Sequence, residues 1–94
     1  MKDIEDLIKD LKHKDDSVRR HAIEILKIIG DDKAVDVLIV ALNDKNRFVR
    51  QEAIAALGKI GGIRPVGPLS QALKQEKNEF VKNSIQIVLD KLRQ

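Results

Sequence analysis

Side chains that could act in catalysis or bind a metal are few and poorly grouped. The two histidines, His13 and His21, are separated by eight positions, so they lack the His-x-x-x-His spacing that places two imidazoles on one helix face. The chain has no cysteine, which excludes a thiolate nucleophile, a disulfide and cysteine-bound zinc. The residue types therefore predict no metal site and no cofactor.

Adjacent aspartates form the other candidate chemical groups. Asp15-Asp16 and Asp31-Asp32 resemble carboxylate pairs for acid–base catalysis. Each pair directly precedes an expected helix, where the free backbone N–H groups and the helix dipole favour a negative charge. We therefore assign both pairs to helix starts, and we predict a protein that is not an enzyme and has no catalytic residue.

Apolar residues at helical spacing, separated by short polar segments, predict the elements that carry these side chains. Ile4, Leu7 and Leu11, for example, step by three and four positions, as one face of a helix requires. The same spacing recurs along the chain. Helices are expected at residues 3–12, 16–29, 33–43, 47–60, 65–75 and 79–92.

Capping residues agree with these boundaries. Asp15, Asn46 and Asn78 each stand three residues before the valine that begins the repeated apolar spacing of a helix, which is where an N-cap is expected. Gly30 and Gly61-Gly62 follow helices, where a left-handed conformation is favoured. Pro65 suits the start of the fifth helix because little backbone hydrogen bonding is lost there.

The chain repeats itself with a period of about 31 residues. A shift of 31 places Val18-Arg19 on Val49-Arg50 and Ile29-Gly30 on Ile60-Gly61, and a shift of 32 places Phe48 on Phe80. One helix pair cannot bury its own apolar face, whereas stacked pairs share a core. We therefore predict one all-α domain, an α-solenoid of three antiparallel helix pairs with repeats at about 1–30, 31–62 and 63–94. The alternative is a compact helical bundle with a coincidental period.

Composition and charge exclude several classes of protein. The 94 residues are 43% hydrophobic and 35% charged, with a net charge of +3, and opposite charges alternate along the chain rather than forming a basic tail. The longest apolar run, Val37–Leu42, is far below the ~20 residues that span a bilayer. Residues 1–6 are too acidic for a secretory signal. We expect a cytoplasmic protein that does not enter membranes.

The repeated residues resemble the short HEAT-like repeats of the phycobilin-lyase type. Their unit reads Asp-x-x-Val-Arg-x-x-Ala, and the chain matches it at 15–22 and again, in part, at 47–53; the third copy is degenerate, with Lys82 at the arginine position. The resemblance implies a right-handed superhelix whose second helices line the concave, partner-binding side. It also implies that Arg19 and Arg50 bridge to acidic or carbonyl groups of the adjacent unit, with Asp15 as the expected local partner of Arg19.

Two enzymatic relatives within this resemblance are disfavoured. Di-iron deoxyhypusine hydroxylases carry His-Glu pairs where this chain has Arg20-His21, Gln51-Glu52 and Asn83-Ser84. Bilin lyases enclose a tetrapyrrole, for which this chain is short. The resemblance is therefore specific for the architecture and weak for the function.

Second-helix positions that differ between the repeats are the candidate partner-binding residues. They are Arg20, His21, Glu24, Arg47, Phe48, Gln51, Glu52, Phe80, Asn83 and Ile87. The whole set of variable positions also includes Asp16, Ser17, Ile28, Ala55, Lys59, Glu79, Ser84 and Lys91. It has equal numbers of acidic and basic residues, which predicts a neutral groove and disfavours nucleic acid. Phe48 and Phe80 form either an apolar ridge for a partner or part of the core between repeats.

We predict a small scaffold that binds a protein or peptide through its second helices. The alternative is a self-associating structural unit, a possible homo-oligomer, because the last helix carries more apolar residues than one neighbour could cover. A nucleic-acid-binding accessory protein and a bilin-lyase-like protein are less favoured.

Overall fold

Three helix pairs make up the computed structural model, which describes residues 2–94. The elements are α1 (Ile4–Asp10), α2 (Asp16–Ile29), a 3-10 turn (Asp32–Ala34) leading into α3 (Val35–Ala41), α4 (Arg47–Ile60), α5 (Val66–Gln75) and α6 (Glu79–Leu92). No strand occurs between residues 2 and 94. The predicted all-α class and six helices are therefore confirmed.

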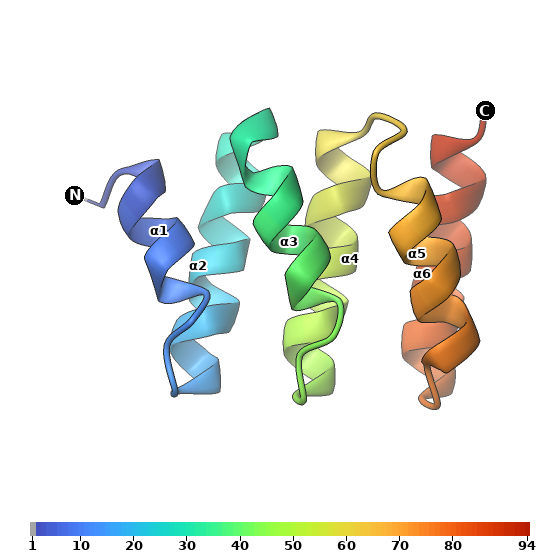
Figure 1. Ribbon diagram of the computed structural model, residues 1–94, viewed down its shortest axis with the longest axis horizontal. Helices are drawn as coiled ribbons and strands as arrows, with labels where there is room; N and C mark the ends of the chain where they lie inside the picture. Colours follow the sequence, from blue (N-terminus) through green and yellow to red (C-terminus); the bar gives the residue numbers. More distant parts are fainter. Residues whose placement is uncertain (1) are drawn as a thin grey trace.

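The pairs stack side by side in chain order, in two layers. In Figure 1 the first helices α1, α3 and α5 lie in front of the second helices α2, α4 and α6, and the two chain ends lie at opposite ends of the stack. The central helix α4 packs against α2, α3 and α6. The molecule measures 35 × 25 × 16 Å, so it is an open α-solenoid and not a closed bundle.

The second helices begin at the predicted N-caps, and α2 and α4 end at the predicted glycines, although Gly61 (φ 83°, ψ −164°) lies outside the left-handed helical region. The side chains of Asp15 and Asn46 accept hydrogen bonds of 2.8 Å from the backbone N–H groups of Ser17 and Phe48. Asn78 accepts one of 3.1 Å from Val81 N–H. Gly30, with φ of 70°, ends α2 in the left-handed conformation, which costs least for glycine.

The first helices are shorter than predicted at their ends. The helix expected at 3–12 covers Ile4–Asp10, and that expected at 33–43 begins as a 3-10 turn before Val35–Ala41. Lys12 N–H donates to Lys9 O and Asn43 N–H to Val40 O, so the last turns tighten to i,i+3 bonds. The last turns of α1 and α3 are therefore 3-10 turns and not α-helical.

The core lies between the two layers. Leu26, Leu38, Leu57 and Leu69 are fully buried. Val81, Ile85, Val88 and Leu89 of α6 are buried as well, because α6 packs against both α4 and α5. The last helix was expected to carry more apolar residues than one neighbour could cover, and in the structure two neighbours cover them, although Ile87 stays 69% exposed.

The second helices α4 and α6 approach closely at Gly58. A Cβ atom at this position would lie 2.9 Å from Val88 Cγ2. Lys91 of α6 crosses the same contact, and its Nζ donates a 2.7 Å hydrogen bond to the carbonyl oxygen of Gly58. The absence of a side chain at residue 58 thus sets the distance between the second and third pairs.

None of the helices within residues 2–94 has both the length and the apolar character needed to cross a membrane.

Candidate functional site

Arg19, in the first turns of α2, links the first helix pair to the second. Its Nε and Nη2 donate to the two carboxylate oxygens of Asp44 at 2.8 and 3.1 Å, and its Nη1 donates to the carbonyl oxygens of His13 and Lys14 at 2.7 and 3.1 Å. Arg19 is only 6% exposed. The guanidinium therefore joins the α1–α2 loop to the loop that precedes α4.

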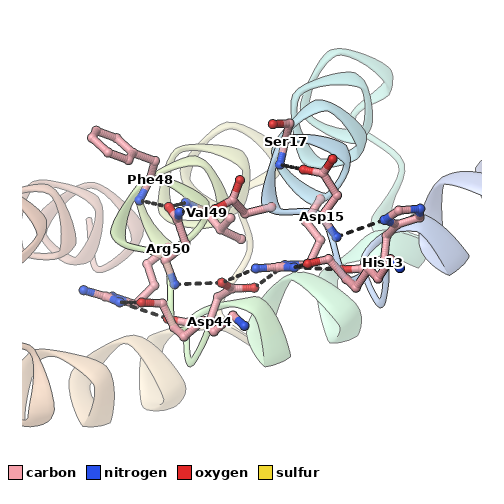
Figure 2. A network of polar contacts seen from close by, with 12 residues as sticks. His13, Asp15, Ser17, Asp44, Phe48, Val49 and Arg50 are labelled. Carbon is pink, nitrogen blue, oxygen red and sulfur yellow. Dashed lines mark hydrogen bonds and ion pairs between the residues drawn. The ribbon is translucent and has the colours of Figure 1, made fainter.

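Arg50 repeats this arrangement one unit later. Its Nε and Nη2 donate to Glu76 at 2.8 and 3.0 Å, and its Nη1 donates to the carbonyl oxygens of Asp44 and Lys45 at 2.9 and 3.3 Å. Figure 2 shows Asp44 between the two units, in contact with Arg50 and with the arginine of the preceding pair. We call Arg19, Asp44, Arg50 and Glu76 the arginine ladder.

The ladder confirms the bridging role that the resemblance implied and corrects one partner. Asp15 was expected to pair with Arg19, and this is wrong. The Asp15 carboxylate accepts from Ser17 N–H instead, because it serves as the N-cap of α2, and Arg19 reaches across to Asp44. The bidentate geometry suits a guanidinium, whose planar fork matches a carboxylate.

Both ladder carboxylates are stabilised in their charged form. Burial acts to raise the pKa of Asp44, but hydrogen bonds from the Arg19 guanidinium and from Asn46 N–H outweigh it, so the pKa lies below its ordinary value. Burial likewise acts to raise the pKa of Glu76, but hydrogen bonds from the Arg50 guanidinium and from Asn78 N–H outweigh it. The pKa of Glu76 therefore also lies below its ordinary value. The pKa of Arg19 is raised by its hydrogen bond to Asp44.

These pKa values predict how stability depends on pH. A carboxylate whose pKa is lower in the folded state contributes stability that is present above its unfolded pKa, about 4, and is lost as the pH falls through the folded value. We expect an Asp44→Asn, Glu76→Gln variant to be less stable than the parent at pH 7 by about 2 kcal/mol. The stability difference should shrink between pH 5 and pH 3, as measured by urea unfolding. A constant difference over that range would contradict the assignment.

The ladder is built for structure and not for chemistry. Each guanidinium is held by two carbonyl oxygens and one carboxylate, so little bonding capacity is left for a ligand. Across residues 2–94, no group of three or more histidine, aspartate or glutamate side chains is placed to hold a metal ion.

A groove between α4 and α6 is the candidate site on the second-helix layer. It consists of two adjoining hollows of about 160 and 180 Å³. Phe48, Phe80 and Arg47 line the first, Ala55 and Ile87 line the second, and Gln51 lines both. Gln51 Nε2 donates to Ser84 Oγ between the two helices. We call this the α4–α6 groove.

The phenylalanine rings lie at one end of this groove and are exposed. Phe48 is 49% exposed and Phe80 77%, so the alternative that both rings belong to the core is wrong. The guanidinium carbons of Arg20 and Arg47 lie 5.3 and 4.8 Å from the centroid of the Phe48 ring, which is cation–π distance. The arginine contacts hold the Phe48 ring at the rim of the groove.

The charges of the second-helix layer are not as balanced as their numbers predict. Glu52 pairs with Lys27 at 3.8 Å and Glu79 with Lys82 at 3.2 Å, both lysines lying outside the predicted set. Asp16 accepts a 2.7 Å hydrogen bond from Asn46 Nδ2. The four basic residues of the variable second-helix positions form no ion pair with a carboxylate of residues 2–94. They are Arg20, Arg47, Lys59 and Lys91. The neutral groove expected from counting is thus locally positive.

The predicted site residues fall into two groups. The structure brings Arg47, Phe48, Gln51, Phe80 and Ile87 together in the groove. The others do not line either hollow: Arg20, His21 and Glu24 lie exposed on α2, Asn83 lies exposed on α6, and Glu52 turns toward Lys27 with its Oε2 buried.

Further residues line the groove besides the ten candidates. Asn78 was expected only as a cap, and the buried Ile54 and Val88 belong to the core, yet all three line the hollows. Ala55 and Ser84 line the second hollow as well, in agreement with their place among the variable second-helix positions. Their small side chains leave space between the helices.

A family model described as HEAT repeats matches residues 4–90, almost the whole chain. No curated protein matches it.

Proposed function

The chain belongs to the HEAT-repeat family, and from that premise we propose that it is a non-catalytic scaffold that binds a protein or peptide partner in the α4–α6 groove. HEAT repeats typically mediate protein–protein interactions. The family membership supports the class of partner, and the shape of the groove supports the location. The cytoplasmic setting stays a prediction from the sequence.

The observation that carries the proposal is the exposed apolar lining of the groove. Phe48, Phe80 and Ile87 are 49%, 77% and 69% exposed although apolar hollows lie beside them. Burying such side chains against a partner contributes about 25 cal/mol per Å² of apolar surface, and aromatic side chains are enriched at the centres of protein interfaces. The rings are already in place on rigid helices, so binding requires little ordering.

The groove supports binding better than catalysis. Its polar groups are the Arg47 guanidinium, the amides of Gln51 and Asn78 and the Ser84 hydroxyl. None of these acts as a general base near neutral pH, and no histidine or carboxylate of the described chain lines either hollow to activate the hydroxyl. A bilin-lyase-like or hydroxylase activity therefore gains no support from this site.

Replacing both phenylalanines by serine tests the proposal. Peptides selected on the parent from a random 12-residue display library should bind the Phe48→Ser, Phe80→Ser variant at least tenfold more weakly, because the apolar contact is lost. The melting temperature should change by less than about 2 °C, since both rings are exposed. Fluorescence anisotropy and thermal unfolding followed by circular dichroism provide the two measurements.

Two controls complete this experiment. Ile63, in the loop between α4 and α5, is 80% exposed and lies away from the groove. Ile63→Ser removes a similar exposed apolar side chain and should leave peptide binding unchanged. Light scattering at high micromolar concentration tests self-association: a dimer that the double phenylalanine variant abolishes would assign the groove to a second copy. Peptides that bind the double variant as well as the parent would place the binding surface elsewhere.

A further inference from the structure

We propose that the ligand of the α4–α6 groove is an acidic peptide, an extended segment with carboxylates at both ends and apolar residues between them. This inference rests on the proposed function and adds the chemistry of the partner. It follows from the positions of the cations relative to the apolar hollows.

One cationic end of the groove is built around Phe48. Arg20 of α2 and Arg47 of α4 both contact its ring, and neither guanidinium pairs with a carboxylate within residues 2–94. Stacking on the ring orients the guanidiniums and leaves their N–H groups available. A carboxylate is the partner that this fork binds best, through two parallel hydrogen bonds.

The other cationic end lies at the carboxyl ends of the same helices. Lys59 is exposed in the last turn of α4, and Lys91 of α6 uses one N–H on Gly58 O, which leaves two further donors. Twelve positions separate Arg47 from Lys59, which is about 18 Å along a helix. An extended peptide covers that length with about six residues.

Most acidic residues of this layer have partners of their own. Glu52 pairs with Lys27 on the α2 side, Glu79 pairs with Lys82, and Asp16 accepts a hydrogen bond from Asn46 Nδ2. Glu24, which lies on α2 outside both hollows, has neither kind of partner within residues 2–94, whereas all four cations of the set lack an ion pair there. The local field in the groove therefore favours a negatively charged ligand, although the face is neutral by residue count.

The apolar centre favours a peptide over a nucleic acid. Every nucleotide of a strand carries a phosphate, so a strand lying along the groove would place phosphates over the centre as well as over the two ends. The centre is lined by Ala55, Ile87 and the Gln51 amide and has no cation. A peptide can place apolar side chains there and its carboxylates at the two ends.

The composition of selected peptides is the first test. The random 12-residue library is selected on the full chain, and the binders are sequenced. We expect an excess of aspartate and glutamate on both sides of an apolar centre. The affinity of a labelled binder, measured by fluorescence anisotropy, should fall about three- to tenfold in the Arg20→Gln, Arg47→Gln variant and by a smaller factor in Lys59→Gln.

The control variant removes two charges elsewhere. Lys9→Gln, Lys74→Gln changes the net charge by the same amount on exposed residues of the first helices, and it should leave the affinity unchanged. Raising the salt from 50 to 300 mM should weaken peptide binding to the parent more than binding to the Arg20→Gln, Arg47→Gln variant. Salt screens charge–charge attraction, and the variant has two fewer cations at the groove.

The outcomes separate this inference from the proposed function. Binders that depend on Phe48 and Phe80 but carry no acidic excess, or that are indifferent to Arg20 and Arg47, would overturn the acidic ligand and leave the groove as a binding site. If no binder depends on the two phenylalanines, both proposals fail. A labelled 12-nucleotide oligothymidylate that binds through Arg20 and Arg47 when no peptide does would replace the peptide with a nucleic acid.

Discussion

Arg50→Ala lowers the free energy of unfolding by about 2–4 kcal/mol, in our expectation, the largest effect of any change considered for this protein. The substitution removes the cation beside Glu76, whose side chain is only 7% exposed, and leaves that carboxylate buried without its charged partner. It also removes the donor shared by the carbonyl oxygens of Asp44 and Lys45. Urea unfolding followed by circular dichroism measures the loss.

The third helix pair provides a matched control for this prediction. Lys82 occupies the repeat position of Arg50, but its side chain is 41% exposed and pairs only with the exposed Glu79. Lys82→Ala should therefore change the stability by less than about 0.5 kcal/mol. Combining Arg50→Met with Glu76→Leu should recover part of the loss, because the uncompensated charge is gone. Equal effects of Arg50→Ala and Lys82→Ala would contradict the role of the ladder.

The second large effect is expected at Gly58, where α4 and α6 are closest. A valine there brings its Cβ to 2.9 Å from Val88 Cγ2, and the stiff, buried Val88 side chain cannot turn away freely. Forcing extra methyl groups into such a contact costs about 1–3 kcal/mol, somewhat offset by the poor helix propensity of glycine. We expect Gly58→Val to lower the stability by about 2 kcal/mol in urea unfolding.

Two further variants isolate the steric cause. Val88→Ala combined with Gly58→Val should be more stable than Gly58→Val alone, because the truncated side chain makes room for the new one. Ala55→Val, at an exposed position of the same helix, has room for the added methyl groups and should lower the stability by less than about 1 kcal/mol, mainly through the lower helix propensity of valine. If the Val88→Ala substitution only adds to the loss, the contact between α4 and α6 does not limit residue 58.

The helices and their order can be predicted from local patterns in the chain. The three- and four-residue steps of apolar side chains and the caps at Asp15, Asn46 and Asn78 act within one helix, so they can be read locally. The 31-residue repeat required the helix pairs to share one core, and the stack follows from that requirement. The sequence left open whether Phe48 and Phe80 are exposed or belong to the core between repeats. Their equivalent places in two repeats do not show whether the rings face solvent or a neighbouring helix.

The pairing of the charged side chains depends instead on how the helix pairs pack. Asp15 lies four residues from Arg19, yet the arginine bonds to Asp44, 25 residues away, because the stacked pairs bring the two loops together and Asp15 caps its own helix. The same packing turns Glu52 toward Lys27 and leaves Arg20 and Arg47 without a carboxylate partner in residues 2–94. The groove is therefore locally positive, although its acidic and basic residues are equal in number. Such contacts depend on the distance and rotation between helix pairs, and no local pattern in the chain contains that information.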